Sequence, residues 1–181
     1  MALVPRLFLI SHASTEAQRV VAFPSDEPVS DRGRRELTRA TAPVTDRALT
    51  APELRTIETA AALGLSAAVE PLLRDLDFGR WTGRTMEEVP ESGLAVWLGD
   101  PESAPHGGES IHDLIVRAGT WLTSLMDSPE RIVAVTHAAV VRAATLCALG
   151  APASAFWRVD VRPLAVTRLD GRDGRWNLRL G

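Results

Sequence analysis

The chain has 181 residues, with 20 basic and 23 acidic side chains and a formal net charge of -3. Globular domains usually run to about 100–200 residues, so this length predicts a single domain over residues 1–181. A single cysteine excludes a disulfide scaffold and any zinc site built on cysteine pairs. The near balance of charges gives no basic field for nucleic acid or an anionic membrane.

All the basic residues are arginine, because the chain has no lysine. A guanidinium binds an anion through a planar fork that a lysine ammonium does not offer, so some of these arginines are candidate anion ligands. Heavy use of arginine is also typical of a GC-rich genome. Composition alone leaves both interpretations open.

The sequence also bears on where the protein works. No run approaches about 18 consecutive apolar residues, the length of a membrane span. Residues 1–9 lack the basic start, the apolar run and the cleavage site of a secretory signal. We therefore expect a protein of the cytoplasm with no membrane partner.

Short apolar runs predict the strands of a sheet. Residues 6–10 and 131–136 are continuous apolar runs, the pattern of strands buried on both faces. Shorter strands are predicted over residues 46–50, 67–70, 156–161, 165–169 and 175–180. Residues 170–174 contain two Asp-Gly turn signals and predict a hairpin between the last two strands.

Helical spacing and end signals predict the remaining elements. Pro52 stands just inside the start of one helix and Gly64 just past its end, while Ser30 or Asp31 caps another and Gly150 ends the last. The predicted helices cover residues 31–41, 51–63, 86–98, 110–126 and 139–149, with loops over residues 75–84 and 100–108. This alternation predicts a three-layer α/β sandwich whose sheet is mainly parallel with an antiparallel C-terminal edge.

Two histidines follow the two buried strands. His12 comes just after the strand that ends at Ile10, and His137 follows the strand that ends at Thr136. Ligands in open α/β sheets bind at the carboxyl ends of the strands, so we expect both rings to face one crevice. The alternative is that each is a hydrogen-bonded structural histidine.

Arg55 lies in the first turns of the helix predicted after Pro52. A guanidinium beside free N–H groups at a helix N-terminus makes a good anion site. The alternative is a solvated arginine on the helix surface.

These residues carry a resemblance to the histidine phosphatase superfamily, which has the phosphoglycerate mutase-like fold. Ser11-His12-Ala13-Ser14-Thr15 resembles its Arg-His-Gly-x-Thr motif, and the stretch from Ala51 to Ala60 resembles Ser-Pro-x-x-Arg-x-x-x-Thr-Ala. Residues 76–83 are similar to its Asp-Phe-Gly-x-Trp-x-Gly loop, residues 107–110 to its Gly-Glu-Ser helix start, and residues 135–142 to Val-Ser-His-Gly-Gly-x-x-Arg. In length and loops the chain is similar to broad-specificity and α-ribazole phosphate phosphatases.

The resemblance implies a role for each matched residue. His12 is the expected nucleophile, which becomes a phosphohistidine while its second ring nitrogen donates to a backbone carbonyl. His137 and Arg55 are expected to bind the phosphoryl oxygens. Asp75 stands where the phosphatases usually have the Glu that protonates the leaving alcohol, and Glu109 is a second candidate for that acid or a helix cap. The chemistry needs no metal or cofactor.

The chain departs from the motif at the nucleophile, where Ser11 replaces the usual Arg and Ala13 the usual Gly, and at Ala138, which replaces a Gly. Loss of one oxyanion donor typically costs about 10²–10³ in rate. Candidate groups that compensate are Ser11, Thr15, Gln18, Arg19, Arg80, Arg84 and Arg142, with a solvated loop as the alternative for Arg80 and Arg84. Glu109 and Ala138 are further candidate substrate-binding residues.

The expected activity is hydrolysis of small phosphomonoesters, so the expected partner is a small-molecule phosphate ester. One alternative is a family member without turnover that binds phosphate ligands or regulates. A second is a protein phosphohistidine phosphatase. A homodimer remains an open alternative.

Other conspicuous residues are interpreted as structural. Cys147 is expected to be a packing thiol on a helix, and His106 a solvated loop residue, with contact to substrate as its alternative. Trp97 and Trp121 suit helices, Trp157 and Trp176 suit strands, and Trp81 suits the border of the pocket.

Overall fold

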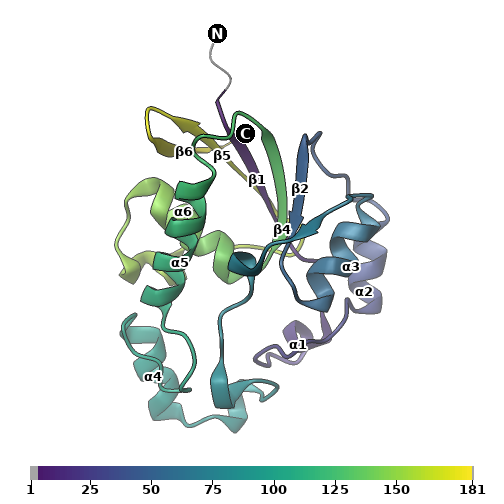
Figure 1. The fold of residues 1–181 in the computed structure, drawn as a ribbon. Helices are drawn as coiled ribbons and strands as arrows, with labels where there is room; N and C mark the ends of the chain where they lie inside the picture. The colour runs from purple at the N-terminus through teal and green to yellow at the C-terminus, as the bar shows by residue number, and fades with distance from the viewer. Residues whose placement is uncertain (1–3, 181) are drawn as a thin grey trace.

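The computed structural model describes residues 4–180, so the segment 1–9, from which no secretory signal is expected, lies partly outside the described residues (Figure 1). One six-stranded sheet has the order β3-β2-β4-β1-β5-β6. Its strands are β1 (Arg6–Ser11), β2 (Arg47–Thr50), β3 (Ala68–Val69), β4 (Arg131–Thr136), β5 (Val166–Arg172) and β6 (Arg175–Arg179). The first four are parallel, and the hairpin β5–β6 adds antiparallel to β1. The prediction of a mainly parallel sheet with an antiparallel C-terminal edge is confirmed.

The two apolar runs form the centre of the sheet because both of their faces are covered. In β4, Ile132, Val133, Ala134 and Val135 are fully buried. Parallel strands are normally covered by helices on both sides, which is why these residues show no polar alternation. Strand β1 lies beside β4, so the two predicted core strands are neighbours.

Helices cover the two faces of the sheet, as Figure 1 shows. Helices α5 (Ile111–Ser124) and α6 (Ala138–Leu149) pack on one face with the largest apolar cluster. Helices α2 (Asp31–Leu37) and α3 (Leu54–Ala62) lie on the other. The three-layer sandwich predicted from the sequence is therefore confirmed.

Local signals set most helix ends. The Ser30 side chain accepts from the Gly33 N–H at the start of α2, and Ser110 forms a capping box with Asp113 at the start of α5. Helix α6 ends at Gly150, which is left-handed with φ 61°. Helix α3 begins at Leu54 instead of residue 51 because Glu53, its N-cap, is extended.

Two predictions of elements were wrong, one short helix was missed and another helix is shorter than predicted. The helix predicted over 86–98 is divided at Pro90 into a 3₁₀ turn (Met86–Glu88) and α4 (Glu91–Gly99). The strand predicted over 156–161 is a 3₁₀ helix, η4 (Ala153–Arg158), which opens after Pro152 and carries Trp157. The short helix α1 (Glu16–Arg19) was not predicted, although a Thr15–Gln18 capping box begins it. Helix α2 also ends at residue 37, four residues before the predicted end.

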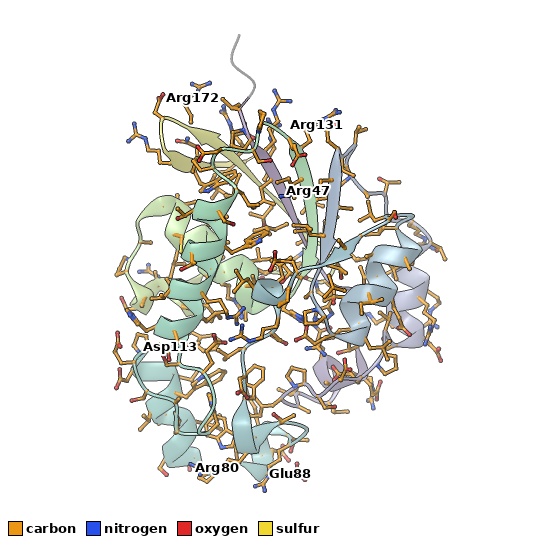
Figure 2. All side chains as sticks on the ribbon, in the orientation of Figure 1. Arg47, Arg80, Glu88, Asp113, Arg131 and Arg172 are labelled. Carbon is orange, nitrogen blue, oxygen red and sulfur yellow. The ribbon has the colours of Figure 1, made fainter. Side chains whose placement is uncertain are left out.

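The segment between β3 and α5 forms a lobe beyond the carboxyl edge of the sheet, with α4 at its outer end (Figure 1). Its interior is aromatic, and the rings of Phe23, Phe78, Trp81, Trp97 and His106 lie within 5.1–6.3 Å of their neighbours. The prediction of a solvated His106 is wrong, since this side chain is 1% exposed. Arg80 and Glu88 mark the far end of the lobe in Figure 2. Among residues 4–180 no helix has the length and apolar character needed to cross a bilayer.

Candidate active site

The register of the central strands brings two histidines together. Ser11 pairs with Thr136 at the carboxyl ends of β1 and β4, so His12 and His137 follow at adjacent positions. The His12 N–H donates to the Thr136 carbonyl at 2.9 Å. The two rings are edge to face with centroids 5.3 Å apart, and both are buried.

Hydrogen bonding fixes the orientation of the His12 ring. Its Nδ1–H donates to the Ala13 carbonyl at 2.8 Å, which leaves the lone pair on Nε2. Burial, together with the nearby charges of His137 and Arg55, lowers the pKa of His12 from 6.5 to about 4. The imidazole is therefore neutral at neutral pH, the form that a nucleophile needs.

Arg55 reaches the same place from α3 and is 1% exposed. Its Nη2 donates to Asp75 Oδ2 and its Nη1 to the Ser25 carbonyl, each at 2.7 Å, while its Nε has no partner among the described residues. The N–H groups at the start of α3 are not all free as expected, because Asp26 Oδ1 accepts from the Leu54 N–H at 2.7 Å.

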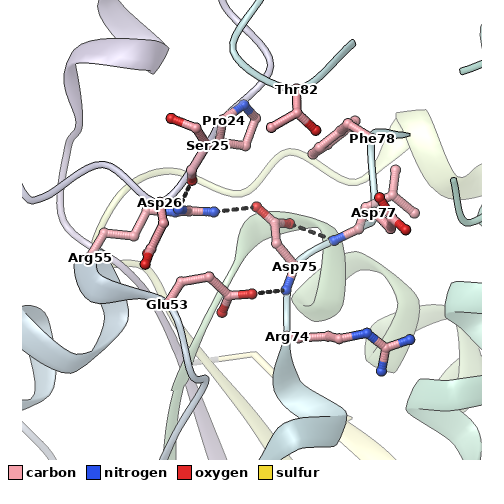
Figure 3. A pocket seen from close by; sticks show the side chains of 11 residues that line it. Pro24, Ser25, Asp26, Glu53, Arg55, Arg74, Asp75, Asp77, Phe78 and Thr82 are labelled. Atoms are coloured by element: carbon pink, nitrogen blue, oxygen red, sulfur yellow. Dashed lines mark hydrogen bonds and ion pairs between the residues drawn. The ribbon is translucent and has the colours of Figure 1, made fainter. Parts of the chain in front are cut away.

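Asp75 contacts both Arg55 and His137, and Figure 3 shows its contact with Arg55. Its Oδ2 lies 2.7 Å from Arg55 Nη2 and 3.3 Å from His137 Nδ1. Burial alone raises the pKa of Asp75, but the charges of His137, Arg55 and His12 outweigh it and leave the pKa below its usual value. The carboxyl group is thus ionised in the ligand-free chain.

Glu53 is a member of this cluster that the sequence analysis missed. Its Oε2 accepts from His137 Nε2–H at 2.7 Å, and its Oε1 accepts from the Asp75 N–H at 3.0 Å. Burial opposes ionisation, yet the hydrogen bond and charge of His137 lower the pKa of Glu53. A usable signal was its position, because Glu53 follows β2 closely, as His12 and His137 follow β1 and β4.

Two adjoining pockets open at this cluster. The one at the histidine pair has about 150 Å³ and is lined by His12, Thr15, Ala17, Gln18, Ala22, Pro24, Glu27, Arg55, Asp75, Phe78, His137, Ala138, Ala139 and Arg142. The other, drawn in Figure 3, has about 360 Å³ and shares Pro24, Arg55, Asp75 and Phe78 with the first. Together they offer a small buried end at the histidines and a wider, acidic opening.

The predicted substrate-binding residues divide into two groups. Thr15, Gln18 and Ala138 line the histidine pocket. Ser11 does not line either pocket, because its Oγ donates to the Arg162 carbonyl at 2.9 Å. Glu109 does not either: its oxygens accept from Arg117 at 2.8 and 2.7 Å. Glu109 also does not cap α5 with its side chain, since Ser110 does so.

Of the candidates to replace the usual arginine, only some reach the histidine pocket. Arg19 is exposed and paired with Glu16, and Arg80 donates to the Pro105 carbonyl in the lobe. Neither lines the pocket, nor does Arg84, whereas Arg142 does. The prediction that Trp81 borders the pocket is wrong, because Trp81 lines neither of the two pockets. Within residues 4–180 there is no group of three or more acidic, His or Cys side chains arranged to hold a metal ion.

Known proteins resemble this chain along nearly its whole length. A family model for the histidine phosphatase superfamily (branch 1) matches residues 7–180. The glucosyl-3-phosphoglycerate phosphatase of Mycolicibacterium vanbaalenii is 30% identical over 215 residues, covering 97% of this chain and 93% of the relative. Phosphoserine phosphatase 1 of Hydrogenobacter thermophilus is 28% identical over 168 residues, covering 84% and 80%.

The fold agrees with these matches. The crystal structure of a putative α-ribazole-5'-P phosphatase from Escherichia coli superposes with a TM-score of 0.85 at 24% identity, covering 97% of this chain and 94% of that one. The matched segment contains both histidines, Arg55 and Asp75, and the contacts among these side chains gather them into one cluster. The chain belongs to the histidine phosphatase superfamily.

Proposed function

We propose that this protein hydrolyses small phosphate monoesters through a phosphohistidine on His12. The observation that carries the proposal is the His12 ring itself, which is neutral, held at Nδ1 and set in a pocket with His137 and Arg55. Membership of the superfamily supports the reaction, and the phosphatases among its relatives act on several different esters by name. The precise ester is therefore a separate question from the chemistry.

The phosphoryl group is proposed to bind through donors that surround Nε2. Arg55 supplies a charged donor, His137 supplies a ring N–H, and the N–H of Ala138 lies at the start of α6. Gln18 uses its Oε1 to accept from the Thr15 N–H, so its amide nitrogen remains to donate to a phosphoryl oxygen. These groups stabilise the charge that spreads over the equatorial oxygens as the ester bond breaks.

In the first step His12 Nε2 forms a bond to phosphorus while the P–O bond to the alcohol breaks. Asp75 is the proposed acid that gives the leaving oxygen its proton, and in the second step it takes a proton from the water that attacks the phosphohistidine. Asp75 is ionised in the free chain by His137 and Arg55. A phosphoryl group that engages Arg55 removes part of this stabilisation and adds negative charge nearby, so ester binding favours protonated Asp75.

Ser11 is proposed to make the enzyme slower than relatives with arginine at that position. Its hydroxyl is engaged with Arg162, so it does not replace the missing donor. Gln18 and the α6 N–H are neutral groups and compensate in part. Loss of one oxyanion donor corresponds to about 10²–10³ in rate.

The test is turnover of p-nitrophenyl phosphate by the wild type and by His12→Ala, with His112→Ala as the control. His112 is an exposed histidine paired with Glu102, so its loss should leave the rate unchanged. We expect His12→Ala to lose at least about 10³-fold in kcat, the scale of a lost nucleophile. Phosphorylation of His12 after an alkaline quench would be detected by mass spectrometry.

Other outcomes separate the alternatives. Equal residual rates in wild type and His12→Ala, with phosphate still bound, would point to a binding protein without turnover. Hydrolysis confined to a phosphohistidine-bearing protein would point to the protein phosphatase. Asp75→Asn should slow alkyl phosphates more than p-nitrophenyl phosphate, because p-nitrophenolate leaves without a proton.

A further inference from the structure

Arg142 lies on the face of α6 that borders the histidine pocket. It comes four residues after Ala138 and three after Ala139, spacings that place the three side chains on one side of a helix. All three line the pocket with His12 and Gln18. Arg142 therefore borders the space in which an ester bound at His12 would lie.

The Arg142 side chain is fixed before any ligand arrives. Its Nε donates to the Val159 carbonyl at 2.7 Å. Its guanidinium carbon lies 5.7 Å from the centre of the Phe156 ring and 5.6 Å from that of Trp157. One hydrogen bond and two aromatic rings thus hold the fork in place, which lowers the entropic cost of binding an anion.

The charge of the half-buried Arg142 has no counter-ion among residues 4–180, in contrast with the two buried arginines. Arg55 pairs with Asp75, and Arg117 pairs with Glu109. No carboxylate of residues 4–180 forms an ion pair with Arg142, and Asp160 acts on it only from a distance. Burial lowers the pKa of Arg142, which means that its positive charge is poorly solvated. An anion in the pocket would relieve that cost.

The phosphoryl position already has its charged partners. The charges that act on the His12 ring come from His137, Arg55 and Asp75. Arg142 comes instead from α6, and its contacts are with the Val159 carbonyl and with the Phe156 and Trp157 rings. Its fork is available to a part of the substrate other than the phosphoryl group under attack.

We propose that Arg142 binds a second anionic group, a carboxylate or another phosphate, carried by the leaving alcohol. This proposal rests on the phosphatase function above and names its substrate class: phosphate esters of anionic alcohols. Both groups present two oxygens that match the planar fork of a guanidinium.

The experiment compares esters that differ only in the second group. The first pair is glycerol 3-phosphate and 3-phosphoglycerate, in which a hydroxymethyl group is replaced by a carboxylate. The second pair is propane-1,3-diol monophosphate and bisphosphate, in which a hydroxyl group is replaced by a second phosphate. We expect the wild type to prefer at least one anionic member. Arg142→Gln should reduce kcat/KM for that member by about 10–100-fold, the scale of a charge-assisted hydrogen bond. The kcat/KM for the ester of the neutral alcohol should change little. Arg142→Lys, which keeps the charge without the fork, should lie between the two.

Arg80→Gln is the matched control, because Arg80 also donates to a backbone carbonyl but lies at the far end of the lobe (Figure 2). Equal losses of kcat/KM for esters of anionic and of neutral alcohols in Arg142→Gln would overturn the proposal. Arg142 would then act on the phosphoryl group or on stability. Calorimetric binding of the same esters to His12→Ala tests the preference without turnover. If that protein binds esters of neutral and of anionic alcohols equally, the Arg142 proposal fails even when hydrolysis is established. If the wild type hydrolyses no ester but the binding preference is present, only the proposed phosphatase function fails.

Discussion

Glu53 contacts both His137 and Asp75 in the candidate site. One of its oxygens accepts from the His137 ring and the other from the backbone of Asp75. His137 lies between two carboxylates, with Glu53 Oε2 2.7 Å from its Nε2 and Asp75 Oδ2 3.3 Å from its Nδ1. We propose that Glu53 acts on the reaction through His137, as a positioning residue that fixes the orientation of the ring.

Replacement of this carboxylate by an amide gives the first prediction at the residue scale. Glu53→Gln keeps an oxygen that accepts from His137 but removes its charge. We expect kcat to fall by about 10–100-fold, the value of a hydrogen bond to a charged group. The deficit should grow from acid to neutral pH, because Glu53 carries the charge that Gln lacks only above its pKa, which burial raises but the hydrogen bond and charge of His137 bring below the usual value. A pH series of kcat and KM measures this.

The control for Glu53→Gln is Glu58→Gln on the same helix. Glu58 accepts from the Val29 N–H and lies outside both pockets. A pH-independent loss in Glu53→Gln, equal to that of the control, would mean that Glu53 serves only the fold.

At the scale of elements, α2 holds the loop that carries His12. The Ser30 N–H and Oγ–H both donate to the Ser14 carbonyl, at 2.9 and 2.8 Å, and Ser14 Oγ–H donates to Glu36 at 2.7 Å. Gly33 permits this close approach, because a Cβ there would lie 2.3 Å from the Ser14 carbonyl oxygen and 2.6 Å from Val29. The loop and the helix are therefore packed without room for a methyl group.

Gly33→Ala should destabilise the protein by about 1–3 kcal/mol, the range for overpacking, despite the better helix propensity of alanine. The displaced loop should also lower the turnover of p-nitrophenyl phosphate. Thermal unfolding and kinetics measure the two effects. Gly99→Ala at the end of α4 is the control, since no described atom lies within 4 Å of its added Cβ; a Gly33→Ala protein as stable as this control would contradict the packing argument.

Elements with a complete local signal could be predicted from the sequence. The apolar runs of β1 and β4 and the Gly150 end of α6 are examples, because burial on both faces and a left-handed cap each leave a pattern in the chain. The 3₁₀ helix η4 could not be distinguished from a strand, because its apolar residues Phe156 and Trp157 pack against other segments. Glu53 has the same limit: its partner His137 is 84 residues away, and no local rule pairs them.

Across the whole molecule, the sheet joins both ends of the chain. Strand β1 begins at Arg6 and has β4 on one side and β5 on the other. Because of the hairpin β5–β6, the strand that precedes His12 is an interior strand and not an edge strand. We propose on this basis that residues 1–181 form one domain. The region around His12 should then unfold together with the rest of the domain.

The free energy of unfolding should depend on pH through His12. Its pKa is 6.5 unfolded and about 4 in the fold, so between these values the unfolded chain binds a proton that the folded chain does not. Stability should therefore rise with pH across this window, by about 3 kcal/mol for the His12 term, and burial lowers the pKa of His106 in the same direction. Urea unfolding of wild type and His12→Gln from pH 4 to 6.5 should show one transition and a shallower slope for the variant. Identical slopes would contradict the assignment to His12.

The pairing of Asp75 with Arg55 also has a consequence for the end of the reaction. In the free chain this carboxylate is an internal competitor for the guanidinium that a phosphate needs, and the two lie only 2.7 Å apart. Association of phosphate is then an exchange of one anion for another, and its affinity is the difference between two interactions. Under the proposed mechanism inorganic phosphate is the second product, and it has no alcohol with which to gain further contacts. We therefore expect phosphate to bind less tightly than an ester and to leave the site readily.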